Sequence, residues 1–238
     1  MKKIQTFLSV ILAVCCLPVH CVTQSAGEVI QHHIAAMGGR EKLQAIRSLY
    51  MEYTIKEAMD TVPSCVFIVS NKGYRNNMRI MGYTITTCYT DQGGWLADEF
   101  KNIPAHIISK GMYDQHKDKL EPAGALLHYA EKGNKVSYLG REQENHVITL
   151  VTPDDFTIYY YIDTATGYIA KIKRTAVFEG KPVAATIFFS DYRKTGEGYI
   201  MPYSFFISIP SLLGLTCTVT TVRINQPLDP SQFLMPGS

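Results

Sequence analysis

Runs of β-branched and aromatic residues, separated by short turns, fill the stretch 156–209. The runs occupy 157–162, 168–174, 185–193 and 203–209, and Gly, Pro and Asp gather in the gaps between them. Runs of this kind at short intervals are typical of consecutive antiparallel strands joined by hairpins. The stretch therefore predicts part of a large antiparallel sheet, and nothing in it resembles a catalytic loop.

The segment 49–56 alternates between apolar and polar residues. Met51, Tyr53 and Ile55 take one set of positions, and Glu52 and Lys56 take the other. A strand sends successive side chains to opposite faces, so one face is predicted to cover an apolar interior and the other to meet water. With these strands, about ten or eleven are predicted in one curved sheet. The remaining predicted strands lie at 64–70, 74–81, 83–90, 95–97, 135–140 and 146–151.

A helical pattern precedes the first strand. Ser25 has the side chain of an N-cap, and Gly38 with Gly39 marks the end of the helix. A second, shorter helix is predicted at 40–47. One face of the first helix is apolar, because Val29, Ile30, Ile34 and Met37 recur at helical spacing.

Residues 103–132 interrupt the rhythm of strands. The segments 103–119 and 123–132 are each predicted to be helical, with Glu121 and Pro122 between them and Gly133 at the end. These segments form an insertion between two groups of strands.

The first residues have the layout of a secretory signal peptide. Lys2 and Lys3 precede the apolar run 4–17, and Pro18 ends that run. The run is shorter than the roughly 20 residues that span a bilayer. Residues 1–24 are therefore predicted to be an export signal that is removed.

The rest of the chain, 25–238, fits one domain, because all-β barrels commonly reach roughly 200–250 residues. The full 238 residues carry a net charge of +2, which the leader supplies, so 21 basic and 21 acidic residues remain. A neutral chain gives no electrostatic reason to bind nucleic acid or anionic membranes. A soluble exported protein is the favoured interpretation. A membrane-anchored lipoprotein is the alternative, although Cys15, Cys16 and Cys21 match acylation sites poorly.

Three cysteines follow the leader, namely Cys65, Cys88 and Cys217. An odd number argues against a disulfide scaffold, and burial as small apolar residues is the simpler interpretation. One bridge between Cys65 and Cys88 stays open as an alternative, because consecutive strands often neighbour each other.

The sequence contains no recognisable GxSxG, HExxH, P-loop or GxGxxG motif. Asp154 and Asp155 are interpreted as a loop pair, because adjacent strand residues face opposite ways. His32 and His33 are neighbours on a helix and point in different directions, so they do not form a metal pair. We therefore expect a protein that is not an enzyme and that uses no metal or cofactor.

Four stretches, in this order, resemble the bacterial outer-membrane lipoprotein-sorting carriers, the LolA-like family of the LolA-LolB superfamily. Together they span nearly the whole chain after the leader. They are Ala35-Ala36-Met37-Gly38-Gly39 before Lys42-Leu43; Gly94-Trp95 with the insertion ending Leu126-Leu127-His128-Tyr129; Tyr160-Tyr161-Ile162-Asp163 with Thr166-Gly167 and Ile172; and Asp191-Tyr192-Arg193, Gly198 and Pro202 with the tail 224–230, Phe233 and Pro236.

This resemblance implies a mainly β fold, in which a single curved antiparallel sheet forms an unclosed barrel and helices cover its concave face. It implies an exported, periplasmic carrier or binding protein for lipid or lipoprotein acyl chains, working as a monomer with an envelope protein as donor or acceptor. A non-transporting envelope interaction or sensor protein is the alternative. The lid role falls to the first helix, through Ile30, Ile34 and Met37, and then to the insertion. Arg47 and Arg79 are the candidates for a basic residue that latches such a lid.

The alternation of side chains suggests where cargo would lie. Phe205, Ile207 and Ile209 are expected to face inward on a late strand, because Ser204 and Ser208 mark its wet face. Trp95 has two interpretations, a cavity wall or an edge aromatic under the insertion. The predicted cavity residues are therefore Met51, Tyr53, Ile55, Trp95, Phe205, Ile207 and Ile209.

Overall fold

Strands make up most of the computed structural model, which describes residues 24–57, 60–178, 181–210 and 214–237. Nearly all of the predicted signal peptide lies outside these residues. The strands are β1 (Ser48–Glu57), β2 (Asp60–Val69), β3 (Gly73–Ile80), β4 (Tyr83–Thr90), β5 (Gly93–Asp98), β6 (Ile103–Ile107), β7 (Lys135–Glu142), β8 (Asn145–Val151), β9 (Thr157–Asp163), β10 (Ile169–Phe178), β11 (Lys181–Lys194), β12 (Ile200–Ser208) and β13 (Leu215–Ile224).

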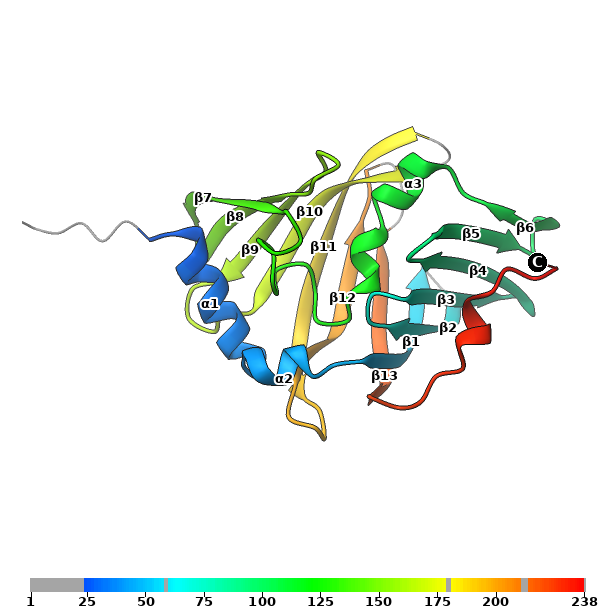
Figure 1. Cartoon of the computed structure of the whole chain (residues 1–238), viewed down its shortest axis with the longest axis horizontal. Coiled ribbons are helices and arrows are strands. Elements are labelled where there is room, and N and C mark those ends of the chain that lie inside the picture. Colours follow the sequence, from blue (N-terminus) through cyan, green and yellow to red (C-terminus); the bar gives the residue numbers. More distant parts are fainter. Residues whose placement is uncertain (1–23, 58–59, 179–180, 211–213, 238) are drawn as a thin grey trace, which may run out of the picture.

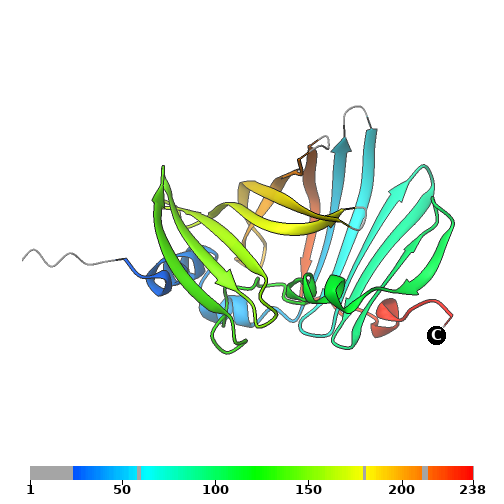
Figure 2. The same cartoon turned by 90° about the horizontal axis from the view of Figure 1, so that it is seen from above.

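All the strands belong to one 13-stranded antiparallel sheet, in the order β6-β5-β4-β3-β2-β1-β13-β12-β11-β10-β9-β8-β7 (Figure 1). The edge strands β6 and β7 do not pair with each other, so the barrel is unclosed, as predicted. The centre of the sheet joins the two ends of the chain, because β1 pairs with β13. Figure 2 shows the β7–β9 end and the β3–β6 end splayed apart, with the helices along one side between them.

The number of strands exceeds the expected ten or eleven by β6 and β13. Residues 103–107 were expected to be helical, yet they pair with β5, where Trp95 lies opposite Ile107. Pairing with a neighbouring strand outweighs weak helical spacing in a segment of only five residues. The hairpins predicted between 156 and 209 are confirmed as β9 to β12.

Both helices predicted before the sheet form, although the second ends at Gln44 and not at 47. Helix α1 (Ala26–Ala36) starts at a capping box, in which the Ser25 hydroxyl accepts from the Glu28 amide at 3.2 Å and the Glu28 carboxylate accepts from the Ser25 amide at 2.8 Å. Its buried face includes Val29, Ile30 and Ile34. A short helix α2 (Arg40–Gln44) follows after Gly38 and Gly39.

The insertion is less helical than the sequence suggested. It contains only the short helix α3 (Lys110–Asp114) and the 3₁₀ turn η1 (Lys117–Leu120). Residues 123–132, predicted to be helical, form turns instead. Gly124 and His128 have φ angles of +83° and +56°, and this left-handed backbone cannot continue a right-handed helix. Among the described residues, no helix is both long and apolar enough to cross a membrane.

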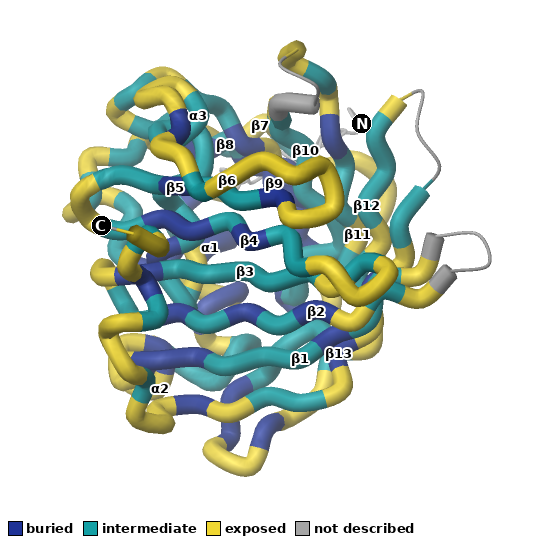
Figure 3. The backbone as a smooth tube through the Cα atoms, turned by 90° about the vertical axis from the view of Figure 1, so that its right-hand side faces the viewer, coloured by how far each residue is buried: buried dark blue, intermediate teal, exposed yellow. Residues whose placement is uncertain are grey.

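Among the described residues the core has one large cluster and two small ones, and one of the small ones joins Tyr89 to Ile108 and Leu120 of the insertion. The larger cluster packs α1, α2 and residues 126–127 against the concave face. A smaller cluster on the convex face contains Cys88, Trp95 and Phe233. The strands β1 to β5 are mostly buried or half-exposed in Figure 3, whereas the turns that join them are exposed.

The convex cluster is closed by the end of the chain, where η2 (Pro230–Phe233) lies across β3 to β5. The Trp95 indole donates to the Phe233 carbonyl at 3.0 Å, and Arg75 donates to the Gln232 carbonyl at 2.7 Å. The Phe233 ring lies so close to Gly73 that a Cβ there would be 2.5 Å from it. Glycine is therefore required at this point of β3.

The open alternative of a Cys65–Cys88 bridge is wrong, because both thiols are free. The two residues lie on β2 and β4, and β3 runs between these strands. With strands spaced about 4.8 Å apart, their backbones are roughly 10 Å from each other, beyond the reach of a disulfide.

We predict that Phe233→Ala lowers the free energy of unfolding by about 3 kcal/mol, because it removes a buried ring from a closed apolar cluster. Urea unfolding would measure the change. Leu234→Ala is the matched control, since Leu234 is 64% exposed and Phe233 only 8%. Equal effects of the two changes would contradict the role given to η2.

Candidate functional site

An apolar cavity of about 290 Å³ lies between the concave face of the sheet and the segments that cover it. From the cover, Ile34, Met37 and Leu126 line it; from the sheet, Tyr160, Phe189 and Met201 line it. No charged side chain belongs to the lining among the described residues, and His33 is the one titratable imidazole there. The arrangement can bind an apolar group and offers little to a polar one.

Helix α1 closes one side of this cavity and is fastened at few points. The His33 ring nitrogen Nδ1 lies 2.9 Å from the Gly167 carbonyl in the β9–β10 turn, and the Ile200 amide donates to the Met37 carbonyl at 3.1 Å. Burial lowers the pKa of His33, so the ring is neutral near pH 7 and donates its Nδ1 proton to this carbonyl. Gly167 has φ +73°, and a Cβ there would be 3.0 Å from the Ala36 side chain.

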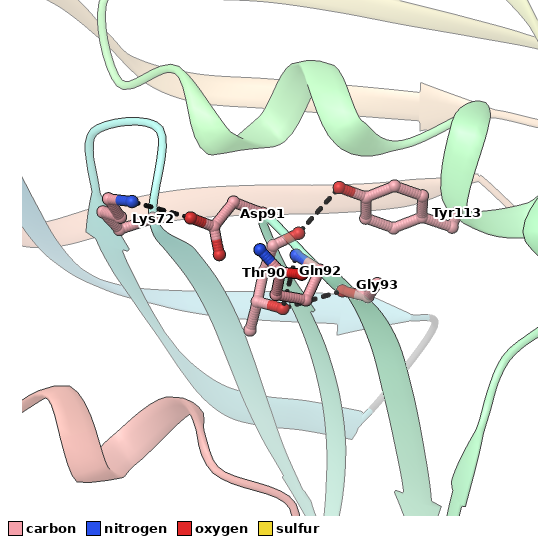
Figure 4. A network of polar contacts seen from close by, with 6 residues as sticks. All are labelled: Lys72, Thr90, Asp91, Gln92, Gly93 and Tyr113. Carbon is pink, nitrogen blue, oxygen red and sulfur yellow. Dashed lines mark hydrogen bonds and ion pairs between the residues drawn. The ribbon is translucent and has the colours of Figure 1, made fainter.

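The insertion closes the other side and is tied to the turns of the sheet. In Figure 4, the Tyr113 hydroxyl donates to the Thr90 carbonyl at 2.7 Å, at the β4–β5 turn. The same turn is held to the β2–β3 turn by an ion pair of 2.7 Å between Lys72 and Asp91. The Asn71 amide also donates to the carbonyl of Leu120 in η1 at 2.9 Å.

One arginine of the sheet fastens the insertion from below. Arg174 on β10 donates to the Asp118 carboxylate at 2.8 and 3.5 Å and also to the Gln115 carbonyl. It points to the concave side, because its strand partner Ile158 is in the main core cluster. Both charged side chains are largely buried, at 13% and 23% exposed, which strengthens their attraction.

Of the two arginines that were candidates for a latch, one caps a helix and the other points away from the concave face. Arg47 donates to the Gln44 carbonyl at 3.1 Å and so caps the end of α2. Arg79 follows Met78, which pairs with the concave-face residues of β2, so Arg79 points the other way. Arg174 was not among the residues predicted to latch a lid. Its position two residues after Ile172 places both side chains on the same face of β10, and Ile172 faces the core.

Under the insertion, η1 packs on tyrosines of the concave face. The His116 ring stacks on Tyr89 with centroids 5.6 Å apart and an interplanar angle of 6°. The Lys119 ammonium lies 5.3 Å from the ring centroid of Tyr74 and 5.5 Å from that of Tyr89. Burial, followed by repulsion from Lys119, lowers the pKa of His116 to about 4.

Comparisons with known proteins identify the fold. No protein-family model matches the chain, and no curated protein matches it in sequence. Solved structures do. A LolA superfamily protein from Nitrosomonas europaea has a TM-score of 0.60 at 9% identity, with 89% of this chain and 98% of that chain covered. The chain has the LolA-like fold.

Two further structures agree with the LolA-like fold. A DUF1329 family protein from Desulfovibrio piger has a TM-score of 0.59 at 10% identity, covering 89% of this chain and 98% of that chain. A domain from Vibrio parahaemolyticus, named for outer membrane lipoprotein sorting, has a TM-score of 0.54 at 14% identity, covering 87% and 94%. These identities support the fold that the sequence resemblance implied, and the fold alone.

Most of the predicted cavity residues lie together on the concave face of the sheet. They form packed core next to the cavity and do not line it. Met51, Tyr53, Ile55, Phe205 and Ile207 all belong to the main concave cluster. The rings of Tyr53 and Phe205 are 5.8 Å apart, and the Tyr53 hydroxyl donates to Asn76 at 2.9 Å. None of the five is among the described residues that line the 290 Å³ cavity, which lies toward β9 to β12.

Two of the predicted cavity residues, Trp95 and Ile209, lie outside the main concave cluster. Trp95 belongs to the convex cluster under Phe233, so its placement on the cavity wall is wrong. Its strand partner is Cys88, and Cys88 faces away from the concave-side residue Tyr89 that follows it. Ile209 lies just beyond β12, half-exposed and outside the core clusters. Of the predicted lid residues, Ile34 and Met37 line the cavity, while Ile30 is buried beside it at 1% exposure.

We predict that Arg174→Met loosens the insertion without unfolding the sheet. The change removes the charged hydrogen bonds to Asp118 and Gln115, each worth about 1.5–3 kcal/mol. Amide hydrogen exchange in 110–120 should become about tenfold faster or more. Arg193→Met is the control, because Arg193 pairs with Asp191 at 2.6 Å on an exposed surface, and its other contact, the ring of Tyr203 on β12, lies within the sheet and not on the insertion. Unchanged exchange in Arg174→Met would remove the fastening role.

Acid should destabilise the protein through His116. Its folded-state pKa of about 4 lies below the ordinary 6.5, so the unfolded chain binds more protons between these values. The free energy of unfolding should therefore fall as the pH drops from 6.5 to 4, by on the order of 2 kcal/mol for this residue. His33 and His146 act in the same direction, since burial lowers both pKa values.

His116→Phe keeps the ring on Tyr89 and removes the proton site, so it should flatten this pH dependence. His106→Phe is the control, because His106 is exposed on β6. Urea unfolding at pH 7, 5.5 and 4 measures the slope. The same slope in wild type and His116→Phe would contradict the prediction.

Proposed function

We propose that this protein is an exported carrier or binding protein for the acyl chains of lipids or lipoproteins. The observation that carries the proposal is the apolar cavity between the α1–α2 and 122–127 cover and the concave sheet. A domain of the same fold is named for outer membrane lipoprotein sorting, which agrees with such a role. The proposal assigns the protein no catalytic step.

The chemistry of the lining suits an acyl chain. A hydrocarbon chain presents only methylene groups, and each one removed from water contributes about 0.8 kcal/mol. Ile34, Phe189 and Met201 offer matching apolar surface. The volume of 290 Å³ lies at the small end of the roughly 300–1,000 Å³ of usual ligand pockets, so a long chain needs the cover to move.

Helix α1 has the features of a cover that moves as a unit. A buried histidine bond and one backbone bond hold its end, and Gly38 and Gly39 follow with φ angles of +119° and +93°. Glycines tolerate such angles at little cost, so they suit a hinge. The insertion, fastened through Arg174, is the second movable cover in this proposal.

The remaining parts of the proposal come from the sequence. A signal peptide at 1–24 would deliver the protein to the periplasm, where it would work as a monomer. An envelope protein would supply or receive the acyl chains. A membrane-anchored lipoprotein is the alternative for its location. A non-transporting interaction or sensor protein is the alternative for its function, and it would co-purify with a protein partner in place of a lipid.

Two phenylalanines that face each other across β11 and β12 test the site. Phe189 lines the cavity, whereas its strand partner Phe205 packs against Tyr53 in the filled part of the core. Phe205→Ala should lower the free energy of unfolding by about 2–3 kcal/mol, because the ring is packed but only half-buried, and should leave the affinity for a fluorescent acyl probe nearly unchanged. Phe189→Ala should lower the free energy of unfolding by less than Phe205→Ala does, and it should reduce the affinity for the probe by about tenfold.

The same substitution on neighbouring strands makes each variant the control for the other. Equal probe affinity in both variants and in the wild type would remove the cavity as the binding site. Native mass spectrometry of protein purified from its own envelope completes the test. A bound lipid or lipopeptide supports the proposal, and an empty chain with a stable protein partner supports the sensor alternative.

A further inference from the structure

The Lys119 ammonium lies against the concave face, and no described residue forms a hydrogen bond with it. Lys119 lies on η1 of the insertion, against the concave face of the sheet, and is half-buried. Its ammonium contacts the ring faces of Tyr74 and Tyr89 at 5.3 and 5.5 Å. Within the described residues it makes no hydrogen bond and no ion pair, although an ammonium carries three donors.

The charges around Lys119 leave it uncompensated. The one carboxylate nearby, Asp118, is engaged by two hydrogen bonds from Arg174. Two cations and one carboxylate therefore share this part of the concave side, an excess of one positive charge. His116 is neutral at pH 7, since burial lowers its pKa to about 4. The phenols of Tyr74 and Tyr89 supply no negative charge, because burial raises the pKa of both.

The position has an energetic cost that a ligand would relieve. Burial lowers the pKa of Lys119 to about 8, against the attraction of Asp118, so the ammonium is charged at pH 7 but disfavoured. Two aromatic faces replace only part of its hydration. An anion brought to the same place would supply the missing hydrogen bonds and the opposite charge.

The cation lies beside the apolar cavity. Tyr160 lines that cavity and is also within electrostatic reach of Asp118 and Arg174. Tyr74, under Lys119, packs against the main concave cluster. The apolar cavity and the cation of Lys119 therefore lie on the same concave side of the sheet.

We propose that Lys119 is the recognition site for an anionic head group, a carboxylate or a phosphate, on an amphiphile whose acyl chain occupies the apolar cavity. This inference rests on the proposed function and narrows its ligand class to amphiphiles with a negative head. Lys119 selects the head group, while the apolar lining supplies most of the binding. Arg174 is already engaged by Asp118, so the selection depends on Lys119.

The test compares probes of one chain length and different head groups. Dodecanoate, dodecyl phosphate and the neutral dodecanol are titrated into the full mature chain at pH 7, below their aggregation limits. Wild type should bind at least one of the two anions about tenfold more tightly than dodecanol, as expected for one partly buried charge contact. The tighter of the two anions identifies the head group. Raising the pH from 7 to 9.5 should remove the preference, because it neutralises Lys119.

Three variants make the result specific. Lys119→Met should bind all three probes about as tightly as the wild type binds dodecanol. Lys119→Arg should keep the preference for anions. Lys135→Met is the control, since it removes the same charge from an exposed position on β7 and should behave as wild type. Retained binding of dodecanol by Lys119→Met shows that the variant is folded.

The outcomes separate this inference from the proposed function. Equal affinity of wild type for the three probes, or an anion preference that survives in Lys119→Met, overturns the head-group site and leaves acyl binding intact. Loss of all three probes in Lys119→Met also overturns it, because Lys119 would then support the cavity rather than select the head. Failure of every probe to bind wild type removes the proposed function and this inference together.

Discussion

A curved sheet that does not close on itself leaves an apolar concave face, and the structure depends on covering that face. Antiparallel pairing satisfies the backbone, but it cannot shield Tyr53, Ile148 or Ile158 from water. Helix α1 and the insertion do so from outside the sheet. Their apolar residues, such as Ile34 and Leu126, complete a core that the strands alone would leave half built.

The two faces of the sheet are covered in different ways. On the convex side, Phe233 fills the space above Gly73, and its backbone accepts the Trp95 indole. On the concave side, the insertion is held by ion pairs and hydrogen bonds, above all those between Arg174 and Asp118. Breaking a largely buried ion pair leaves a charge without its partner, and Leu120, Leu126 and Leu127 add apolar contacts on this side. The two covers therefore differ in the contacts that hold them: the concave one adds a buried ion pair to its apolar core, and the convex one depends on Phe233 and its backbone hydrogen bond.

Much of the fold could be predicted from the sequence, because local patterns carry it. The alternation in 49–56 gave the correct concave face of β1, and Ser25 with Glu28 formed the expected start of α1. Predictions from local patterns were wrong where residues distant in the sequence determine the conformation. Segment 103–107 became a strand because β5 lies beside it, and His128 took a left-handed conformation that stops a helix.

The candidate site was harder to predict for the same reason. The side of the sheet to which Trp95 points depends on its pairing with Cys88 and on Phe233, which lies 138 residues later in the chain. The cavity depends on where the cover rests, so Phe189 and Met201 line it while Phe205 and Ile207 are packed beside it. Arg174 carried a local signal, the alternation with Ile172, but its partner Asp118 lies 56 residues earlier.

The pairing of β1 with β13 has a consequence for how the chain folds. These strands form the middle of the sheet, with Leu49 opposite Ile224, so its two halves join only through the ends of the polypeptide. Contacts so distant in sequence slow folding, since a long loop must close before they form. The sheet cannot assemble until the last strand has been synthesised. A partly synthesised chain therefore lacks the central pair of strands, and its two half-sheets cannot yet join.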